Sequence, residues 1–84
     1  MPWIKRMDDT YIKFDELTKE CFIGAKVEYV KNYTFLATVY VTNKNQSEVI
    51  VVGVNSYTTL QSAKKYCDKM LKQIADKAKE MCDG

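Results

Sequence analysis

The sequence predicts an α+β fold: an antiparallel β-meander of three longer strands with a short N-terminal hairpin, and one long C-terminal amphipathic helix packed on one sheet face. Three observations support this prediction. Residues 21–55 alternate between apolar and polar side chains, and residues 58–82 repeat their apolar side chains with helical spacing. The chain of 84 residues, 46% hydrophobic and 29% charged, has the length and composition of a single globular domain, here residues 1–84.

The helix is predicted from the spacing of its apolar residues. These recur every three or four positions at Leu60, Ala63, Cys67, Met70, Ile74, Ala78 and Met81, and Leu71, Ala75 and Cys82 widen the stripe. Thr58 and Gln61 have the spacing of a capping box at its start. At 1.5 Å per residue the helix would be roughly 37 Å long, and an apolar stripe of that length needs a sheet to pack on.

The N-terminal region, residues 1–20, is predicted to form a hairpin and a turn. The short apolar–polar runs 3–6 and 11–14 flank Met7-Asp8-Asp9-Thr10, which has turn composition, and Asp15 can cap a turn that follows.

Three strands are expected in residues 21–55. In the first, 21–30, Ala25, Val27 and Tyr29 share a face, and Gly24 marks a bulge or the close approach of another backbone. Lys31-Asn32 is predicted to be the two-residue turn to the next strand, because Asn accepts a left-handed conformation.

The other two strands differ in their patterns. In residues 33–42 one face carries Tyr33, Phe35, Ala37, Val39 and Val41, and the other carries Thr34, Leu36, Thr38, Tyr40 and Thr42. The second face is amphipathic, so we expect it to be partly exposed or to contact a partner. Residues 48–54 are apolar on both faces, which is typical of a central strand.

Charge and cysteine content indicate a cytoplasmic protein with no membrane contact. The net charge is +2, and the excess lies on residues 58–84, with six Lys and four acidic residues. Three cysteines, without a signal-like N-terminus, favour a reducing compartment. The longest apolar run, residues 49–54, is far shorter than a membrane span.

The residue types argue against an enzyme, a metal site or a cofactor. The chain has no His, which is the commonest general base and metal ligand, and no Cys-x-x-Cys spacing. Cys67 is expected in the core, and Cys82, near the helix end, is the expected reactive thiol. Asp8-Asp9 and Asp15-Glu16 are interpreted as solvated turn and cap residues.

We expect instead a non-enzymatic module with a protein partner. The candidate interaction face consists of Leu36, Thr38 and Tyr40, with Ile50 or Val52 beside them, because no second helix is predicted to cover it. A homodimer through this face stays open. The alternative is that the N-terminal hairpin, with Trp3, Ile4, Tyr11 and Phe14, folds over the face and hides it.

The second functional hypothesis is weak, sequence-tolerant nucleic-acid binding. Lys65, Lys69 and Lys72 fall on the solvent side of the predicted helix and have the spacing to follow a phosphate backbone. Acidic residues such as Asp68 and Asp76 are interleaved with them, and the chain has only one arginine, Arg6, where base recognition favours arginine. These features favour a solvated helix face over a nucleic-acid site.

The layout also resembles a known group of proteins. The runs Ala37-Thr-Val-Tyr-Val and Val49-Ile-Val-Val-Gly-Val, then Tyr57-Thr-Thr-Leu-Gln-Ser-Ala-Lys-Lys-Tyr, resemble a pattern common in small phage and mobile-element proteins. The opening Trp3-Ile-Lys-Arg-Met-Asp-Asp-Thr-Tyr-Ile is similar to the start of other short phage and bacterial proteins. This resemblance implies a small accessory protein, of a group that includes host-defence inhibitors such as anti-CRISPR proteins. These act mostly by binding a host protein stoichiometrically, which would place this chain in the host cytoplasm.

Overall fold

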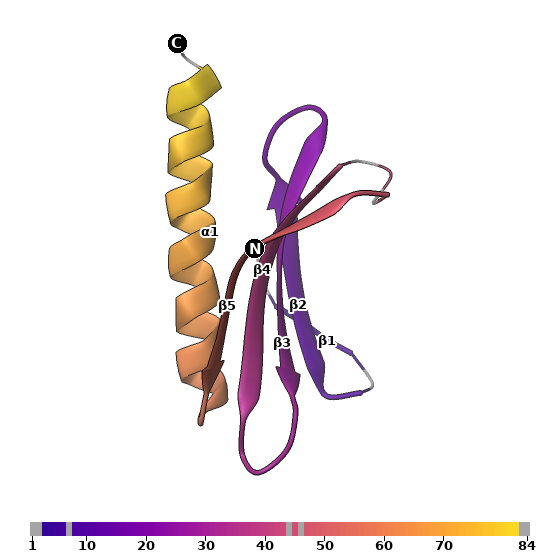
Figure 1. The fold of residues 1–84 in the computed structure, drawn as a ribbon, viewed down its shortest axis with the longest axis vertical. Coiled ribbons are helices and arrows are strands. Elements are labelled where there is room, and N and C mark those ends of the chain that lie inside the picture. Colours follow the sequence, from indigo (N-terminus) through magenta and orange to yellow (C-terminus); the bar gives the residue numbers. More distant parts are fainter. Residues whose placement is uncertain (1–2, 7, 44, 46, 83–84) are drawn as a thin grey trace.

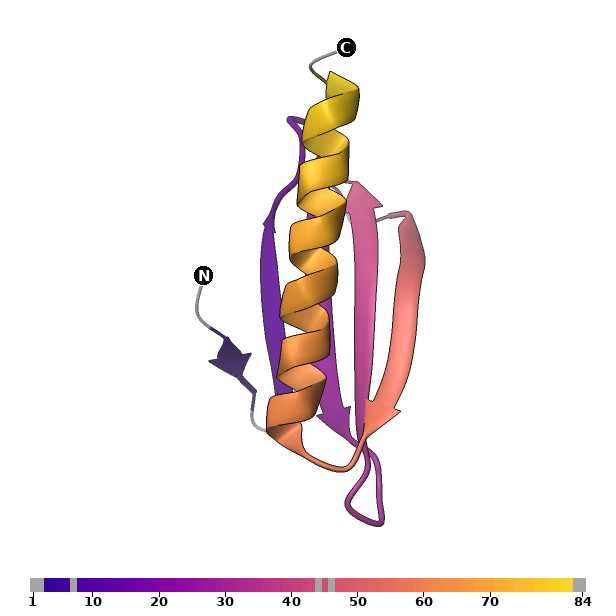
Figure 2. The same ribbon diagram turned by 90° about the vertical axis from the view of Figure 1, so that its left-hand side faces the viewer.

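A computed structural model describes residues 3–6, 8–43, 45 and 47–82, and side-chain packing up to residue 78. In this part of the chain, five antiparallel strands form one sheet in sequence order, and helix α1 packs on one face of it (Figures 1 and 2). The elements are β1 (Ile4–Lys5), β2 (Thr10–Glu16), β3 (Cys21–Tyr29), β4 (Phe35–Asn43), β5 (Val49–Tyr57) and α1 (Leu60–Cys82). The predicted α+β class, with an antiparallel sheet and one C-terminal helix, is confirmed.

The N-terminal hairpin extends the sheet. Strand β2 pairs with β3 along its whole length, from Thr10 opposite Glu28 to Glu16 opposite Phe22, so it is a fourth long strand. Trp3 and Tyr11 pack against the core on the helix side. The alternative in which this hairpin folds over the other face is therefore wrong: in-plane pairing satisfies the backbone groups of β2, and its apolar residues divide between the two faces.

The turn between β3 and β4 lies one residue later than predicted. Thr34 N donates a hydrogen bond to Lys31 O at 3.1 Å, and both central residues, Asn32 and Tyr33, have positive φ (53° and 57°). This is the geometry of a type I′ turn, whose twist matches that of the flanking strands. Tyr33 was expected in the strand, but it lies in the turn with 79% of its surface exposed.

Strand β5 lies at the edge of the sheet, and its predicted central position is wrong. It pairs with β4 on one side, and its apolar residues from Val49 to Val54 are 40–64% exposed, apart from Gly53. A run that is apolar on both faces does not reveal how many strands lie beside it, and the last strand of a meander lies at an edge.

A β-bulge in β5 changes which of its residues share a face. Val39 pairs with Gly53 but Tyr40 pairs with Val51, so Val52 is the extra residue. Val51 and Val54 consequently lie on the same face of the sheet, although strict alternation would separate them.

Helix α1 starts at Leu60 and is capped by Thr59. Ser62 N donates to Thr59 Oγ1 at 3.2 Å, so the cap is one residue later than the predicted Thr58 with Gln61. The reason is that β5 continues to Tyr57, which leaves Thr58 before the cap.

The core lies between α1 and the middle strands and is built from small residues. Ala63 and Cys67 of α1 are fully buried against Ala25, Val27, Ala37 and Val39, and Leu60, Met70, Leu71 and Ile74 surround them. Small side chains let the helix approach the sheet closely, because little volume separates the two backbones. The predicted stripe residues Met81 and Cys82 lie outside the side chains that the structure describes.

Candidate interaction surface

In the described part of the chain, no helix or loop covers the sheet face opposite α1, which we call the outer face (Figure 1). Alternation along the paired strands places on it every second residue of β2, β3 and β4, including Phe14, Phe22 and Tyr40. Three aromatic side chains thus lie where no second layer packs on them.

The outer face contains a hollow of about 510 Å³. Its apolar lining comes from four strands: Ile12 and Phe14 from β2, Phe22 from β3, Tyr40 from β4 and Val49 from β5. Phe14 is 49% exposed and Val49 is 56% exposed. A concave surface with half-exposed aromatic side chains is typical of a site that binds apolar groups.

Tyr40 owes its position to Gly24. A Cβ atom at Gly24 would lie 2.6–2.7 Å from the ring and hydroxyl atoms of Tyr40, which is closer than van der Waals contact allows. The β3–β4 register is continuous at this position, so the bulge or backbone contact predicted from Gly24 is wrong. The glycine makes room for the Tyr40 ring on the floor of the hollow.

Charged side chains at the hollow are few. Arg6 and Lys26 line it, and Lys26 Nζ lies 3.4 Å from Glu28 Oε1 on the same strand. The Lys26 charge is therefore partly neutralised within the face. Aromatic and aliphatic groups, rather than a strong field of one sign, characterise this surface.

The structure places Leu36, Thr38 and Tyr40 on the outer face, at consecutive outward positions of β4. Only Tyr40 reaches the hollow. Leu36 and Thr38 lie farther along β4, opposite Ser56 and Val54 of β5. Of the two β5 residues expected beside them, Ile50 pairs with Val41 on the helix side, and Val52 is the bulge residue.

Sequence reasoning missed Phe14, Phe22 and Val49 as part of this surface. The sequence pattern places Phe14 only in the alternative of a covering hairpin, and it places Phe22 on no surface. The alternation of residues 10–16 and 21–29 contained the signal, but the faces of two strands can be combined only once their register is known.

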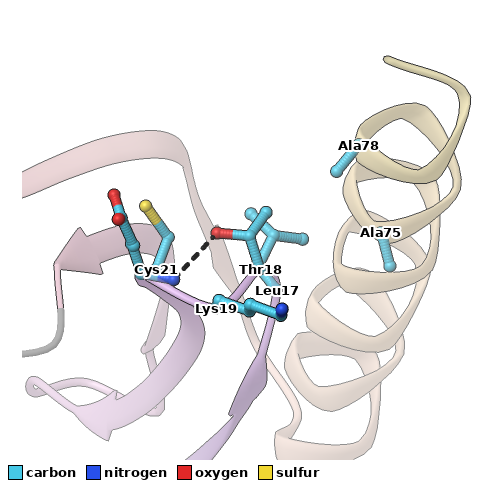
Figure 3. Close-up of a pocket in the computed structure, with 7 residues that line it drawn as sticks. Leu17, Thr18, Lys19, Cys21, Ala75 and Ala78 are labelled. Carbon is cyan, nitrogen blue, oxygen red and sulfur yellow. Dashed lines mark hydrogen bonds between the residues drawn. The ribbon is translucent and has the colours of Figure 1, made fainter. Parts of the chain in front are cut away.

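A second cleft, of about 690 Å³, lies between the β2–β3 turn and the C-terminal half of α1 (Figure 3). Leu17 and Thr18 face Ala75 and Ala78 across it, and Cys21 N donates to Thr18 O at 3.4 Å within the turn. The cleft forms where the helix extends beyond the core. Its polar lining comes from Thr18, Lys19, Glu20 and Cys21 of the turn, and its apolar lining comes from Leu17, Ala75 and Ala78.

The lysines of the alternative hypothesis are exposed on α1. Lys65, Lys69 and Lys72 are spaced by four and three residues and lie on one side of the helix. Asp68, which was expected to compete with them, forms an ion pair with Lys13 of β2 at 2.7 Å. That contact draws one negative charge towards the sheet.

Two findings concern metal-ligating and nucleophilic side chains in the described residues. No group of three or more Cys, Asp or Glu has the arrangement to hold a metal ion in the part of the chain that the structure describes. Burial raises the pKa of the Cys67 thiol to about 12; the charge of Asp68 adds to the shift and Lys13 opposes it. Cys67 is thus a protonated core residue at neutral pH, as predicted. The predicted reactive thiol, Cys82, lies outside the described side chains.

Comparison with known proteins identified no relative. No protein-family model matches the chain, and searches of curated proteins and of solved structures found no match. Within the described residues, no helix has both the length and the apolar character needed to cross a membrane.

Proposed function

We propose that the chain is a small, non-enzymatic protein-binding module, and that the outer face of its sheet holds the partner. The observation that carries this proposal is the hollow of about 510 Å³, lined by Phe14, Phe22 and Tyr40. Aromatic side chains supply large contact area at little cost in conformational entropy, which is why they dominate the energetics of protein interfaces.

The partner's contact segment should itself be apolar. The hollow has an aromatic and aliphatic floor, and one of its two basic residues, Lys26, is paired with Glu28. The most concrete form of the proposal follows the resemblance to phage accessory proteins: stoichiometric inhibition of a host protein, such as a component of a CRISPR defence system.

A pull-down from lysate of the natural host tests the proposal. Tagged wild type, Phe14→Asp, Tyr40→Asp and Tyr33→Asp are compared with and without nuclease, and retained proteins are identified by mass spectrometry. Tyr33 is the matched control, because it is an exposed aromatic residue in the β3–β4 turn, away from the hollow. Its positive φ is also one that Asp tolerates.

The expected result is one dominant host protein that survives nuclease, is retained by wild type and Tyr33→Asp, and is lost with Phe14→Asp and Tyr40→Asp. Circular dichroism of each variant confirms that the fold is intact. Equal retention by all four proteins would reject the outer face as the site.

Nucleic-acid binding is a second candidate, and the Lys13–Asp68 ion pair gives it some support. Because the negative charge of Asp68 is paired with Lys13, it cancels less of the positive charge of Lys65, Lys69 and Lys72. Three phosphate contacts predict that log K falls with log salt concentration with a slope of roughly −2.7 on duplex DNA. Fluorescence anisotropy with a labelled duplex measures this slope for wild type and for a variant with all three lysines changed to Gln. Absence of binding at low salt, or the same slope in both proteins, rejects this candidate.

A further inference from the structure

Strand β5 exposes an edge that has no neighbouring strand in the described chain. It runs for nine residues, Val49–Tyr57, and contains no proline, so every residue carries both a backbone donor and an acceptor. One side of the strand pairs with β4. Apart from Ser56 N, which donates to Asn55 Oδ1 at 3.0 Å, the backbone groups on the other side have no partner strand in the described chain. Such groups are satisfied by water or by another strand.

The side chains of this edge lack the usual protection against pairing. Five of them, Val49, Ile50, Val51, Val52 and Val54, are 40–64% exposed, and no charged residue occurs from Val49 to Tyr57. Natural edge strands are commonly protected by charged residues or by being short. The bulge at Val52 interrupts the regular register of β5, and the segment Gly53–Tyr57 after it pairs without interruption with β4. A partner strand must displace the Asn55 side chain from Ser56 N to pair along the whole of this segment.

The opposite edge of the same sheet is protected. Strand β1 is two residues long and pairs with Tyr11 and Ile12 of β2. Beyond it, the free part of β2 carries Lys13, Asp15 and Glu16. Among the described strands, β5 is therefore the edge that lacks this protection.

We propose that two copies of this chain pair antiparallel through their β5 strands and form one continuous ten-stranded sheet. A strand that pairs antiparallel with its own copy generates a two-fold axis, so the assembly closes as a dimer. Because β5 has no charge, no register brings like charges of two β5 strands together, and valine and isoleucine favour cross-strand contacts.

The small area of this interface predicts a weak, transient association. Pairing along most of β5 buries on the order of 1,000 Å² in total, which is at the low end for specific protein interfaces. The dimer should therefore be reversible, with a dissociation constant in the micromolar range.

The two-fold axis of such a pair is perpendicular to the sheet, so both copies present the same face to the same side. The two α1 helices then lie on one face, and the two outer-face hollows lie together on the other. This consequence gives the proposed protein-binding surface two equivalent sites, but the β5 pairing itself does not depend on the proposed function.

Sedimentation velocity and light scattering of the purified chain, from low to high micromolar concentration, test the pairing. The expected mass rises from 9.7 kDa to twice that value. Val51→Lys and Val54→Lys place a charge on the edge and should remain monomeric over the same range. Val30→Lys is the matched control, because Val30 is similarly exposed (50%, against 54% for Val51 and Val54) but follows β3; it should dimerise like wild type.

Hydrogen exchange locates the interface. Amides of residues 49–57 should gain protection as concentration rises, whereas those of β2 should not. The proposal is overturned if the chain stays monomeric at every concentration or forms assemblies larger than two chains. It is also overturned if Val51→Lys and Val54→Lys dimerise as strongly as the control, or if the dimer forms without added protection in β5. Because no partner protein is present, these results are independent of the pull-down.

Discussion

The two faces of the sheet are built from alternate residues of the same strands but differ in composition. The centre of the helix side consists of small residues that are fully buried, such as Ala25, Ala37 and Val39, and larger side chains such as Trp3 and Tyr11 pack around them. The outer face carries large aromatic residues, Phe14, Phe22 and Tyr40, that are only partly buried. Close packing against α1 needs small side chains, and it provides stability. Large apolar side chains without a covering layer contribute less to stability and leave area for a partner.

The largest expected effect comes from placing a charge on each face in turn. Val39→Asp buries an unpaired carboxylate in the core and should cost more than about 4 kcal/mol, enough to unfold a domain of this size. Thr38→Asp, its neighbour on the outer face, should cost less than about 1 kcal/mol. Urea denaturation followed by circular dichroism measures both values. Similar losses in the two variants would show that the outer face is also core.

The next effect concerns the buried thiol of Cys67 and the partly exposed thiol of Cys21. The folded pKa of Cys67 is raised from 9.0 to about 12, so its contribution to stability is fully present below pH 9. That contribution is lost as the pH rises towards 12, because the unfolded chain releases its proton first. The loss reaches about 4 kcal/mol.

Urea midpoints at pH 8 and pH 11 for wild type and Cys67→Ala measure this difference, and the variant should show a smaller decrease in stability. In a Cys82→Ser background, a thiol reagent at pH 8 should modify the partly exposed Cys21 quickly and Cys67 only upon unfolding. Rapid modification of both thiols would contradict the tight packing of the helix side.

The two interior glycines of the sheet allow a comparison of moderate size. A Cβ at Gly53 would lie 2.6 Å from the Tyr66 hydroxyl and 3.0 Å from Met70 Cε, between β5 and α1. Gly53→Ala should cost about 1–3 kcal/mol, because the ends of the Tyr66 and Met70 side chains must move within the packed space between β5 and α1. Gly24→Ala displaces Tyr40, which can rotate towards solvent, so it should cost less while weakening partner binding. Thermal denaturation measures the loss of stability, and the pull-down measures partner binding. A larger loss of stability for Gly24→Ala than for Gly53→Ala would show that the outer face is packed more tightly than the helix side.

The smallest effect is expected for the ion pair at the margin of the helix side. Asp68→Asn removes the partner of Lys13 and should cost less than about 1 kcal/mol, because Asp68 is half exposed. Lys13 also lies 5.5 Å from the centre of the Trp3 ring, which retains it in position. Denaturation at low and high salt checks this prediction. A decrease of several kcal/mol in the free energy of unfolding would contradict it and show that the ion pair is important for stability.

Part of the interaction surface could be predicted from the sequence, and part could not. Alternation in β4 was enough to place Leu36, Thr38 and Tyr40 on the face opposite the helix. The hollow needs the register of four strands, which brings Phe14, Phe22 and Val49 beside Tyr40. Register depends on pairing between distant segments, and the bulge at Val52 changes it within one strand.

By itself, the sequence determined the α+β class, the strand-rich region and the amphipathic C-terminal helix with Cys67 in its core, because these follow from local periodicity. Only the tertiary structure decided that β5 lies at the edge, that the N-terminal hairpin joins the sheet, and that none of the described elements covers the outer face. The local pattern of apolar residues predicts which side chains are buried, but it does not predict which segment of the chain packs against them. That choice depends on the pairing and packing of the whole chain.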